Sequence, residues 1–192
     1  KLDCQILIRT PGMNFLSDTI SRARKLGIAV TSEMEIFFEF CPCEIIGVTG
    51  SDGKTTVTTI ISEILKNTGR KVFVGGNIGK PLLPRIDDIS PDDMVVAELS
   101  SFQLISMRRS PEIAVVTNIS PNHLDVHKDM REYIDAKKNI FIHQSAFGKS
   151  VFNYDNPITL KISGEARGRV VYFSRLERLS GGVWINENGD IV

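Results

Sequence analysis

The sequence has little of what marks several protein classes. Its three cysteines, Cys4, Cys41 and Cys43 among 192 residues, are too few for the disulfide framework of a small secreted domain. No second group of cysteines or histidines stands near Cys41 and Cys43 to complete a zinc site. Glycine (15) and proline (8) are too scarce for a low-complexity chain. We therefore expect a folded protein with free thiols, in a reducing compartment.

An excess of charge of either sign is also missing. Lys plus Arg and Asp plus Glu each number 23, so no basic surface for a nucleic-acid backbone is indicated. The apolar stretch from Ile28 to Phe40 is interrupted by Glu33, Glu35 and Glu39. It is also shorter than the roughly 18 residues that cross a bilayer. We expect a soluble cytoplasmic protein that binds neither nucleic acid nor membrane.

What the sequence does have is a regular alternation of apolar runs and helical segments. This rhythm predicts an α/β fold whose mostly parallel sheet carries helices on both faces. A first β-α-β series ends in a helix over residues 32–40, and Pro42 separates it from a second series, so we place a boundary near residue 41. The predicted strands are residues 4–8, 28–30, 45–48, 71–74, 94–97, 113–116, 150–153 and 170–173. The other predicted helices are residues 14–25, 55–67, 81–87 and 130–144, and a hairpin is predicted over residues 182–192.

Residues 45–56 carry the most informative motif, in which a strand, a glycine-containing loop and a helix follow one another. Gly50 and Gly53 let the backbone wrap a phosphate, and the N–H groups of the loop and of the helix N-terminus favour negative charge there. Lys54 would contact the β- and γ-phosphates, and the Thr55 hydroxyl would ligate Mg²⁺. We interpret this segment as a P-loop that binds ATP.

The loop is a variant, because Val48 stands where the longer G-x-x-x-x-G-K-[ST] pattern has its first glycine. The helix that follows supports the interpretation, since its apolar residues recur at helical spacing. The predicted buried stripe consists of Val57, Ile60, Ile61, Ile64 and Leu65.

Two later strands end in polar residues that suit a metal site. Glu98 follows strand 94–97, and ligands gather at the carboxyl ends of strands in open α/β sheets. We therefore predict that Glu98 binds Mg²⁺, the alternative being an ordinary surface glutamate. The next strand leads to His123 and His127. Because zinc would need further ligands, we expect His123 to ligate a hard cation and His127 to be solvated.

Lys137 occupies the middle of an apolar helix face, with Lys138 toward the edge of that face. A lysine that points inward loses free energy of hydration unless it is paired or neutral. Either the side chain extends to the surface, or it reaches a functional site. The apolar neighbours that share its face are Met130, Tyr133, Ile134, Ile140 and Phe141.

Five segments in this order resemble the Mur ligases, and together they cover nearly the whole chain. They are residues 47–56, 75–79, 98–104, 117–125 and 133–137. The second and third are similar to those of the member that adds D-glutamate to UDP-N-acetylmuramoyl-L-alanine. The resemblance implies ATP-dependent amide synthesis, through an acyl phosphate, during assembly of peptidoglycan precursors in the bacterial cytoplasm.

The same resemblance implies roles for individual residues. The nucleotide site would consist of Gly50, Ser51, Asp52, Gly53, Lys54, Thr55 and Thr56, with Lys54 stabilising the phosphoryl group in transfer. Thr55 and Glu98 would hold one Mg²⁺. His123 would help to hold a second, together with Lys137 as a carbamate formed from CO₂. The implied contacts to the UDP-muramoyl substrate are Asn77, Ser100, Gln103 and the loop Thr10, Pro11 and Gly12.

The family's domain organisation is implied as well. Residues 1–40 would end a UDP-binding, Rossmann-like N-terminal domain, and residues 41–192 would form most of the ATP-binding central domain. The D-glutamate-binding domain would lie outside the chain, so we expect the isolated chain to be inactive and the complete enzyme to be a monomer. The alternatives are a non-catalytic protein that binds nucleotide or phosphate, another P-loop ATPase or kinase, or another Mur-type ligase.

Overall fold

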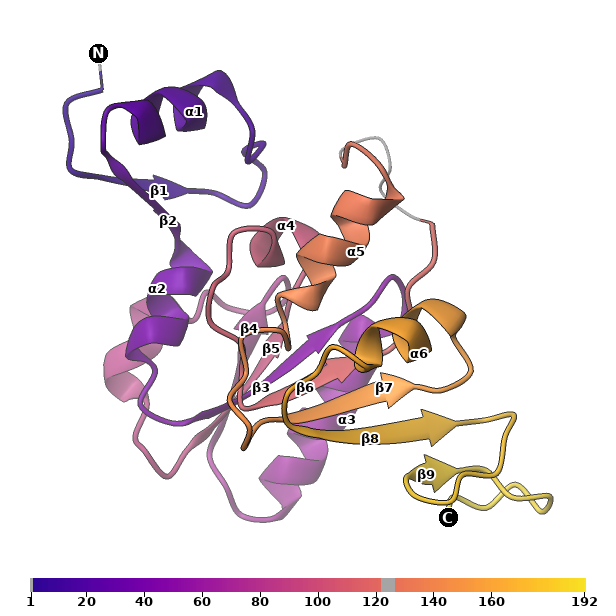
Figure 1. The fold of residues 1–192 in the computed structure, drawn as a ribbon. Helices are drawn as coiled ribbons and strands as arrows, with labels where there is room; N and C mark the ends of the chain where they lie inside the picture. Colours follow the sequence, from indigo (N-terminus) through magenta and orange to yellow (C-terminus); the bar gives the residue numbers. More distant parts are fainter. Residues whose placement is uncertain (1, 122–126) are drawn as a thin grey trace.

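The computed structural model describes residues 2–121 and 127–192, and within them the strands form two parallel sheets (Figure 1). In the smaller sheet β1 (Ile6–Arg9) pairs with β2 (Ala29–Ser32), and α1 (Asp18–Lys25) connects them. Figure 1 shows this N-terminal unit beside the larger body, joined to it through α2 (Glu33–Phe40). The first β-α-β series therefore forms as predicted.

The larger sheet has the strand order β4-β5-β3-β6-β7-β8-β9, with parallel pairing from one edge to the other. Since β3 lies between β5 and β6, the chain extends the sheet first to one side of β3 and then to the other. The carboxyl ends of these three strands therefore meet at one edge. The strands are β3 (Glu44–Thr49), β4 (Val72–Gly76), β5 (Met94–Glu98), β6 (Ile113–Val116), β7 (Lys149–Asn153), β8 (Arg169–Ser174) and β9 (Val183–Trp184).

Helices cover both faces of this sheet, as the alternation predicted (Figure 1). One face packs against α3, and the other against side chains of α2, α4, α5 and α6. Alternate residues of β5 pack on opposite faces of the sheet. Val95 and Ala97 belong to the hydrophobic cluster on one face, and Met94 and Val96 to the cluster on the other. The remaining helices are α3 (Lys54–Asn67), a 3₁₀ helix η1 (Leu83–Asp88), α4 (Ser101–Leu104), α5 (Met130–Lys138) and α6 (Pro157–Ser163).

α2 packs into the main core. Its Met34, Phe37 and Phe38 are buried in the same hydrophobic cluster as Ile45 of β3. Ser32 caps the helix by accepting a hydrogen bond from the N–H of Glu35. The N-terminal unit is thus attached to the larger sheet through a helix anchored in that sheet's core. The domain boundary near residue 41 remains a prediction.

The stripe predicted for α3 is only half right. Val57, Ile61 and Leu65 pack on the sheet, but Ile60 and Ile64 are more than half exposed. The sheet side of the helix instead contains Thr58 and Ser62, which are buried. The apolar stripe of α3 is wider than the surface of the helix that contacts the sheet. The stripe also does not reveal that small polar residues occupy part of the helix–sheet interface.

The other elements differ from expectation mainly at their ends. α5 stops at Lys138 instead of Gln144, because Ile140 and Phe141 form tight i→i−3 turns. The predicted C-terminal hairpin forms, since Trp184 and Val192 exchange backbone hydrogen bonds of 2.9 Å in each direction. The short helices α4 and α6 are not among the predicted elements.

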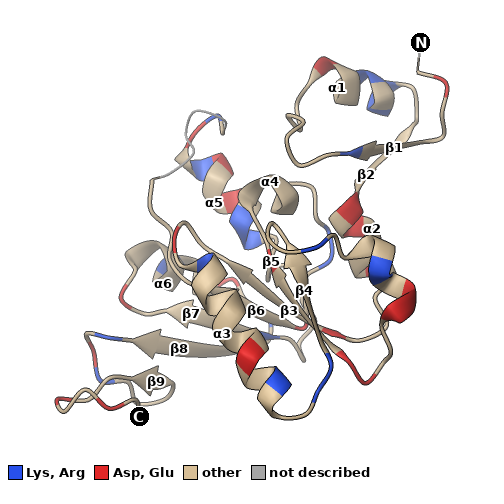
Figure 2. Ribbon diagram, turned by 180° about the vertical axis from the view of Figure 1, so that it is seen from behind, with Lys and Arg blue, Asp and Glu red and all other residues tan. Residues whose placement is uncertain are grey.

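In the described residues, Lys and Arg positions alternate with Asp and Glu positions over the elements, with no stripe of one sign (Figure 2). This distribution agrees with the equal numbers of acidic and basic residues. In the described part of the chain, no helix has the length and hydropathy needed to span a membrane.

Candidate functional site

The loop between β3 and α3, residues 50–53, is called the phosphate loop below. Gly53 precedes the first residue of α3 with φ +78°, a left-handed conformation that favours glycine. At Gly50, a Cβ atom would lie 1.9 Å from Thr117 Oγ1. The two glycines predicted to matter are therefore needed for different reasons, a backbone angle at Gly53 and a close approach at Gly50.

Residues that follow β6 hold the phosphate loop in shape. The Thr117 hydroxyl donates to the carbonyl of Asp52 (2.7 Å), and the Asn118 amide donates to the same oxygen (3.1 Å). In return, the N–H of Asp52 donates to Asn118 Oδ1 (3.0 Å) and the N–H of Ser51 to the Asn118 carbonyl (2.9 Å). These contacts fix the loop backbone before any ligand arrives, which is what a preformed anion site requires.

The residues predicted to hold the first Mg²⁺ are in direct contact. Thr55 Oγ1 donates to Glu98 Oε2 (2.7 Å), and Asn77 Nδ2 donates to Glu98 Oε1 (2.9 Å). Glu98 is 1% exposed. The alternative of a surface glutamate is therefore wrong. A hydroxyl and a carboxylate are hard oxygen donors of the kind that Mg²⁺ prefers, so the residues present suit this ion.

Lys54 and Lys137 approach the phosphate loop from two sides. Lys54 Nζ donates to the Ser51 carbonyl (2.8 Å). Lys137 is 2% exposed, and its Nζ donates to the Gly50 carbonyl (2.8 Å) while lying 4.7 Å from the centre of the Tyr133 ring. Burial, followed by the positive charge of Lys54, lowers the pKa of Lys137 to about 7. The side chain thus points inward to the loop.

Lys138 has different surroundings. Its Nζ forms an ion pair with Glu165 (2.6 Å) at the surface, and Asp135 lies 3.5 Å away. Desolvation lowers the pKa of Lys138, but the hydrogen bond and the negative charge of Glu165 outweigh this effect. The pKa of Lys138 is therefore raised. Of the two lysines, only Lys137 faces the phosphate loop, as the helix face predicted.

The expectation that His127 is solvated is wrong. His127 is 4% exposed, stacks on Phe102 with ring centroids 5.3 Å apart, and places Nε2 2.8 Å from Ser101 Oγ. Its Nδ1 lies 3.5 Å from Glu132 Oε2. An aromatic neighbour and two polar partners make burial of the imidazole favourable.

Ser100 and Gln103, predicted to contact substrate, form a capping box at the start of α4. Ser100 Oγ accepts from the N–H of Gln103 (3.3 Å), and Gln103 Oε1 accepts from the N–H of Ser100 (3.0 Å). Gln103 is buried. Both residues therefore have a structural role that accounts for their side chains, and their contact with substrate remains a prediction.

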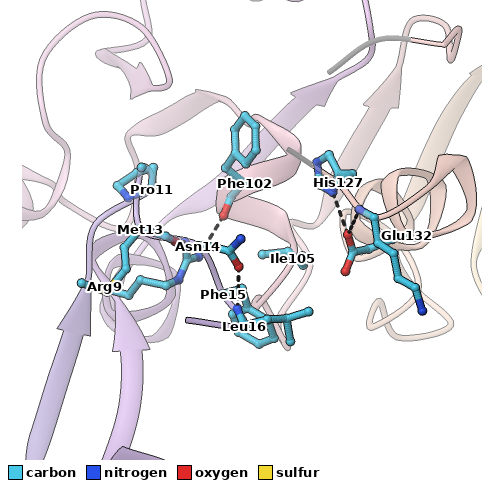
Figure 3. A pocket seen from close by; sticks show the side chains of 12 residues that line it. Arg9, Pro11, Met13, Asn14, Phe15, Leu16, Phe102, Ile105, His127 and Glu132 are labelled. Carbon is cyan, nitrogen blue, oxygen red and sulfur yellow. Dashed lines mark hydrogen bonds and ion pairs between the residues drawn. The ribbon is translucent and has the colours of Figure 1, made fainter. Parts of the chain in front are cut away.

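A pocket of about 540 Å³ lies between the loop after β1 and the region of α4 and α5 (Figure 3). We call it the N-terminal pocket. Pro11 and Gly12 line it, on the side of the pocket formed by the N-terminal unit. Its lining consists of Arg9, Pro11, Gly12, Met13, Asn14, Phe15, Leu16, Phe102, Ile105, His127, Lys128 and Glu132. Of these lining residues, only Pro11 and Gly12 were predicted as site residues. The aromatic and charged side chains of the pocket were not predicted.

The predicted site residues thus form two groups. Residues of the phosphate loop, Lys54, Thr55, Glu98, Asn77 and Lys137 meet at the carboxyl edge around β3, whereas Pro11 and Gly12 line the N-terminal pocket. Thr10 is not among the residues that line this pocket. His123 lies outside the described residues. Among those that are described, no three His, Cys, Asp or Glu side chains gather as a metal site would require. A hydrogen bond between the Tyr133 and Ser51 hydroxyls (3.0 Å), which joins α5 to the phosphate loop, was not predicted.

The sequence of this chain also matches a known protein family. Residues 48–186 match the model described as the Mur ligase middle domain. The chain belongs to the Mur ligase family. In this Mur ligase chain the match starts within β3 and includes the phosphate loop, Glu98 and Lys137.

Curated relatives refine the placement within the Mur ligases. The chain is 58% identical over 183 residues to the UDP-N-acetylmuramoylalanine–D-glutamate ligase of Acetivibrio thermocellus, covering 95% of the chain and 39% of that protein. The ligase of the same name from Clostridium kluyveri is 53% identical over 186 residues, covering 97% of the chain and 41% of that protein. The chain thus spans about 40% of the length of these relatives.

Solved structures share the fold at low sequence identity. A UDP-N-acetylmuramate:L-alanyl-γ-D-glutamyl-meso-diaminopimelate ligase from Neisseria superposes with a TM-score of 0.67 and 18% identity, covering 98% of this chain and 64% of that one. The MurF ligase of Thermotoga maritima, solved in complex with ADP, gives 0.63 and 22%, covering 88% and 46%. These structures confirm the α/β architecture.

Proposed function

We propose that this chain carries the ATP-binding part of a ligase that joins D-glutamate to UDP-N-acetylmuramoyl-L-alanine. The observation that carries the proposal is the convergence of Glu98, Thr55 and Lys137 on the phosphate loop. A simple phosphate-binding turn needs no buried carboxylate or buried lysine beside it. The names of the similar proteins supply the specific substrates.

The proposed reaction has two steps. The terminal carboxylate of the muramoyl substrate attacks the γ-phosphorus of ATP, which forms an acyl phosphate and releases ADP. The amine of D-glutamate then attacks the acyl carbon, a tetrahedral intermediate collapses, and inorganic phosphate leaves as the amide forms. One proton is lost from the amine. Positioning and stabilisation of negative charge are the main tasks of the protein in such phosphoryl transfers.

In this proposal the phosphate loop and Lys54 divide the work on the phosphates. The N–H groups at the N-terminus of α3 would bind the phosphate oxygens, with Ser51, Asp52 and Thr56 lining the nucleotide site. The N–H groups of Ser51 and Asp52 instead donate to Asn118 and hold the loop in shape. Lys54 would leave the Ser51 carbonyl and place its charge on the phosphoryl group in transfer. Thr55 and Glu98 would hold Mg²⁺, which when bound offsets negative charge on the phosphates.

Lys137 is proposed as the site of a carbamate. Its lowered pKa, about 7, leaves a large share of the amine uncharged at neutral pH, and only the free amine adds to CO₂. The addition forms an N–C bond, releases one proton and turns the neutral amine into an anionic oxygen ligand. Together with His123, this group would hold a second Mg²⁺.

The substrate contacts and the assembly state are proposals as well. Asn77, Ser100, Gln103 and the loop of residues 10–12 would bind the UDP-muramoyl substrate, and the complete ligase would be a monomer. Asn77 already contacts Glu98, so a substrate at Asn77 would lie close to the proposed metal. This proximity supports the assignment.

The decisive experiment assays phosphate release by the full-length protein with UDP-N-acetylmuramoyl-L-alanine and a panel of amino acids. We expect release that depends on both substrates and is greatest with D-glutamate. Preference for another amino acid would point to another Mur-type ligase, and release without the muramoyl substrate to an ATPase or kinase. Absence of turnover despite nucleotide binding would favour a non-catalytic role.

Variants test the metal and carbamate assignments separately. Glu98→Ala should weaken Mg²⁺-dependent nucleotide binding, whereas Glu63→Ala, in an exposed ion pair on α3, should leave it unchanged. Equal binding by both variants would remove Glu98 from the metal site. For Lys137, ¹³C NMR with labelled bicarbonate should show a carbamate signal that is absent in Lys137→Ala and present in Lys138→Ala. A signal retained in Lys137→Ala would overturn the assignment.

A further inference from the structure

The guanidinium of Arg9 is buried where the N-terminal unit meets the larger body. Arg9 is the last residue of β1 and is 2% exposed. Burial lowers the pKa of Arg9, and the carboxylate of Glu35 opposes this effect. An arginine so far from water needs several hydrogen-bond acceptors to offset its lost hydration. The question is which segments supply them.

Arg9 donates to two different segments. On one side Nη1 donates to the carbonyls of Thr10 and Met13, at 3.3 Å each. On the other side Nη2 donates to the carbonyl of Phe102 (2.8 Å) and to Ser106 Oγ (3.1 Å). Figure 3 shows the Arg9 side chain extending from β1 to Phe102 across the pocket wall. One planar side chain therefore joins the turn after β1 to α4.

The contact with α4 supplies a hydrogen-bond donor to a carbonyl at the C-terminal end of that helix. Phe102 lies in the four-residue helix α4, where the last carbonyls lack partners within the helix, and a cation is favourable at this end. Ser106 Oγ donates in turn to Glu35 Oε2 (2.9 Å), which also accepts from Ser32 Oγ (2.9 Å). The charge of Arg9 is thus connected to Glu35 through one hydroxyl.

Both joined segments belong to the proposed substrate site. Residues 10–12 are proposed to contact the UDP portion. At its N-terminal end, α4 is capped by Ser100, which lies two residues after Glu98. A ligand that contacts both segments at once binds well only when their separation is fixed, because ordering them on binding would cost affinity.

We propose that Arg9 is a positioning residue that sets the spacing between residues 10–13 and α4 for the nucleotide-sugar substrate. The inference rests on the proposed function for the identity of that substrate. The five N–H donors of a guanidinium lie in one rigid plane, so lysine cannot reproduce contacts on two sides. The hydrogen-bond partners of Arg9 within the described residues include none of the proposed reacting groups, so its effect should be on binding of one substrate.

The test compares Arg9→Met, Arg9→Lys and the control Arg22→Met in the full-length ligase. Arg22 is an exposed cation on α1 in the same unit. We expect Arg9→Met to raise the KM for the UDP-muramoyl substrate about tenfold or more, with the KM for ATP and kcat changed less than twofold. Arg9→Lys should recover only part of the loss, and Arg22→Met should match the parent. An unchanged substrate KM in Arg9→Met, or equal rises for both substrates, would overturn the proposal.

A second measurement separates this proposal from the proposed function. Hydrogen exchange on the 192-residue chain should show faster exchange at residues 103–107 in Arg9→Met, with unchanged exchange in β3 and β5. Where Arg9→Met fails to fold, Ser106→Ala removes a single acceptor and should raise the substrate KM about two- to fivefold. Failure of the parent to use D-glutamate would refute the function while leaving the exchange result to decide on Arg9. Unaltered exchange would contradict the positioning role.

Discussion

The phosphate loop and the N-terminal pocket are held in place by different kinds of contact. The loop is fixed mainly by hydrogen bonds to its backbone from residues 117 and 118, which follow the neighbouring strand β6. The pocket is enclosed by side chains from separate units, with a buried arginine, an aromatic stack and a histidine in its wall. The loop therefore depends on its glycines and on the Thr117 and Asn118 side chains that bind its backbone. The pocket depends on side chains from several elements that bind one another.

The largest effect is expected at Gly50. In Gly50→Ala the new methyl group would overlap Thr117 Oγ1, 1.9 Å away, and approach the Asn118 carbonyl at 3.2 Å. The loop must shift, and we expect a loss of about 3 kcal/mol in unfolding free energy together with loss of nucleotide binding. Denaturant unfolding and ADP titration measure the two effects.

Gly53→Ala is the matched control, since open space surrounds that position and only its φ of +78° is unfavourable. We expect it to cost about 1 kcal/mol. The double variant Gly50→Ala/Thr117→Ala should recover part of the Gly50→Ala loss. Equal losses at Gly50 and Gly53 would contradict the steric explanation.

The next effect is a pH dependence of stability that Lys137 introduces. Its pKa is about 7 when folded, against an ordinary value of 10.5 for a lysine. Between these values the unfolded chain binds more protons, so stability rises as pH increases above about 7. From pH 7 to 9, in CO₂-free buffer, the parent should gain about 2 kcal/mol that Lys137→Met does not gain. Urea unfolding at each pH measures the difference.

Lys138→Met provides the control for this comparison. Its pKa is raised, chiefly by Glu165, so its contribution should persist through pH 9 and be lost only at higher pH. Parallel stability curves for the parent and Lys137→Met would show that burial and the charge of Lys54 do not lower the Lys137 pKa.

The difference between the two regions also explains how much the sequence could predict. The loop motif is contiguous, and parallel strands bring Glu98 to it by a general rule of open sheets, so these contacts could be anticipated. The bond from Arg9 to Phe102 spans 93 residues. No local pattern encodes which carbonyl a buried arginine will reach.

His127 and α3 show the same limit in packing. The burial of His127 depends on Phe102 and Ser101, some 25 residues earlier in the chain, and neither was visible in its local sequence. In α3, periodicity identified an apolar side without showing which part of it meets the sheet, so Ile60 and Ile64 were misplaced. The secondary structure and the parallel sheet follow from local patterns and general rules, whereas these contacts depend on the tertiary arrangement.

A smaller effect is expected for the histidine in the pocket wall. His127→Phe keeps a ring to stack on Phe102 but removes the hydrogen bond to Ser101, and Ser101→Ala removes the other partner. A double-mutant cycle in thermal unfolding should give a coupling of about 1 kcal/mol. A coupling near zero would mean that the two groups are stabilised independently of each other.

The smallest effect is expected at Arg24, which stacks over Phe15 with its Cζ 4.2 Å from the ring centre. Arg24 is exposed, so its cation–π contact should contribute about 0.5 kcal/mol. Arg24→Met keeps an apolar side chain on the ring and should lower stability by no more than this amount. If Arg24→Met lost as much stability as Arg9→Met, exposed contacts would stabilise this region as strongly as buried ones. Burial would then not distinguish the contribution of Arg9 from that of Arg24.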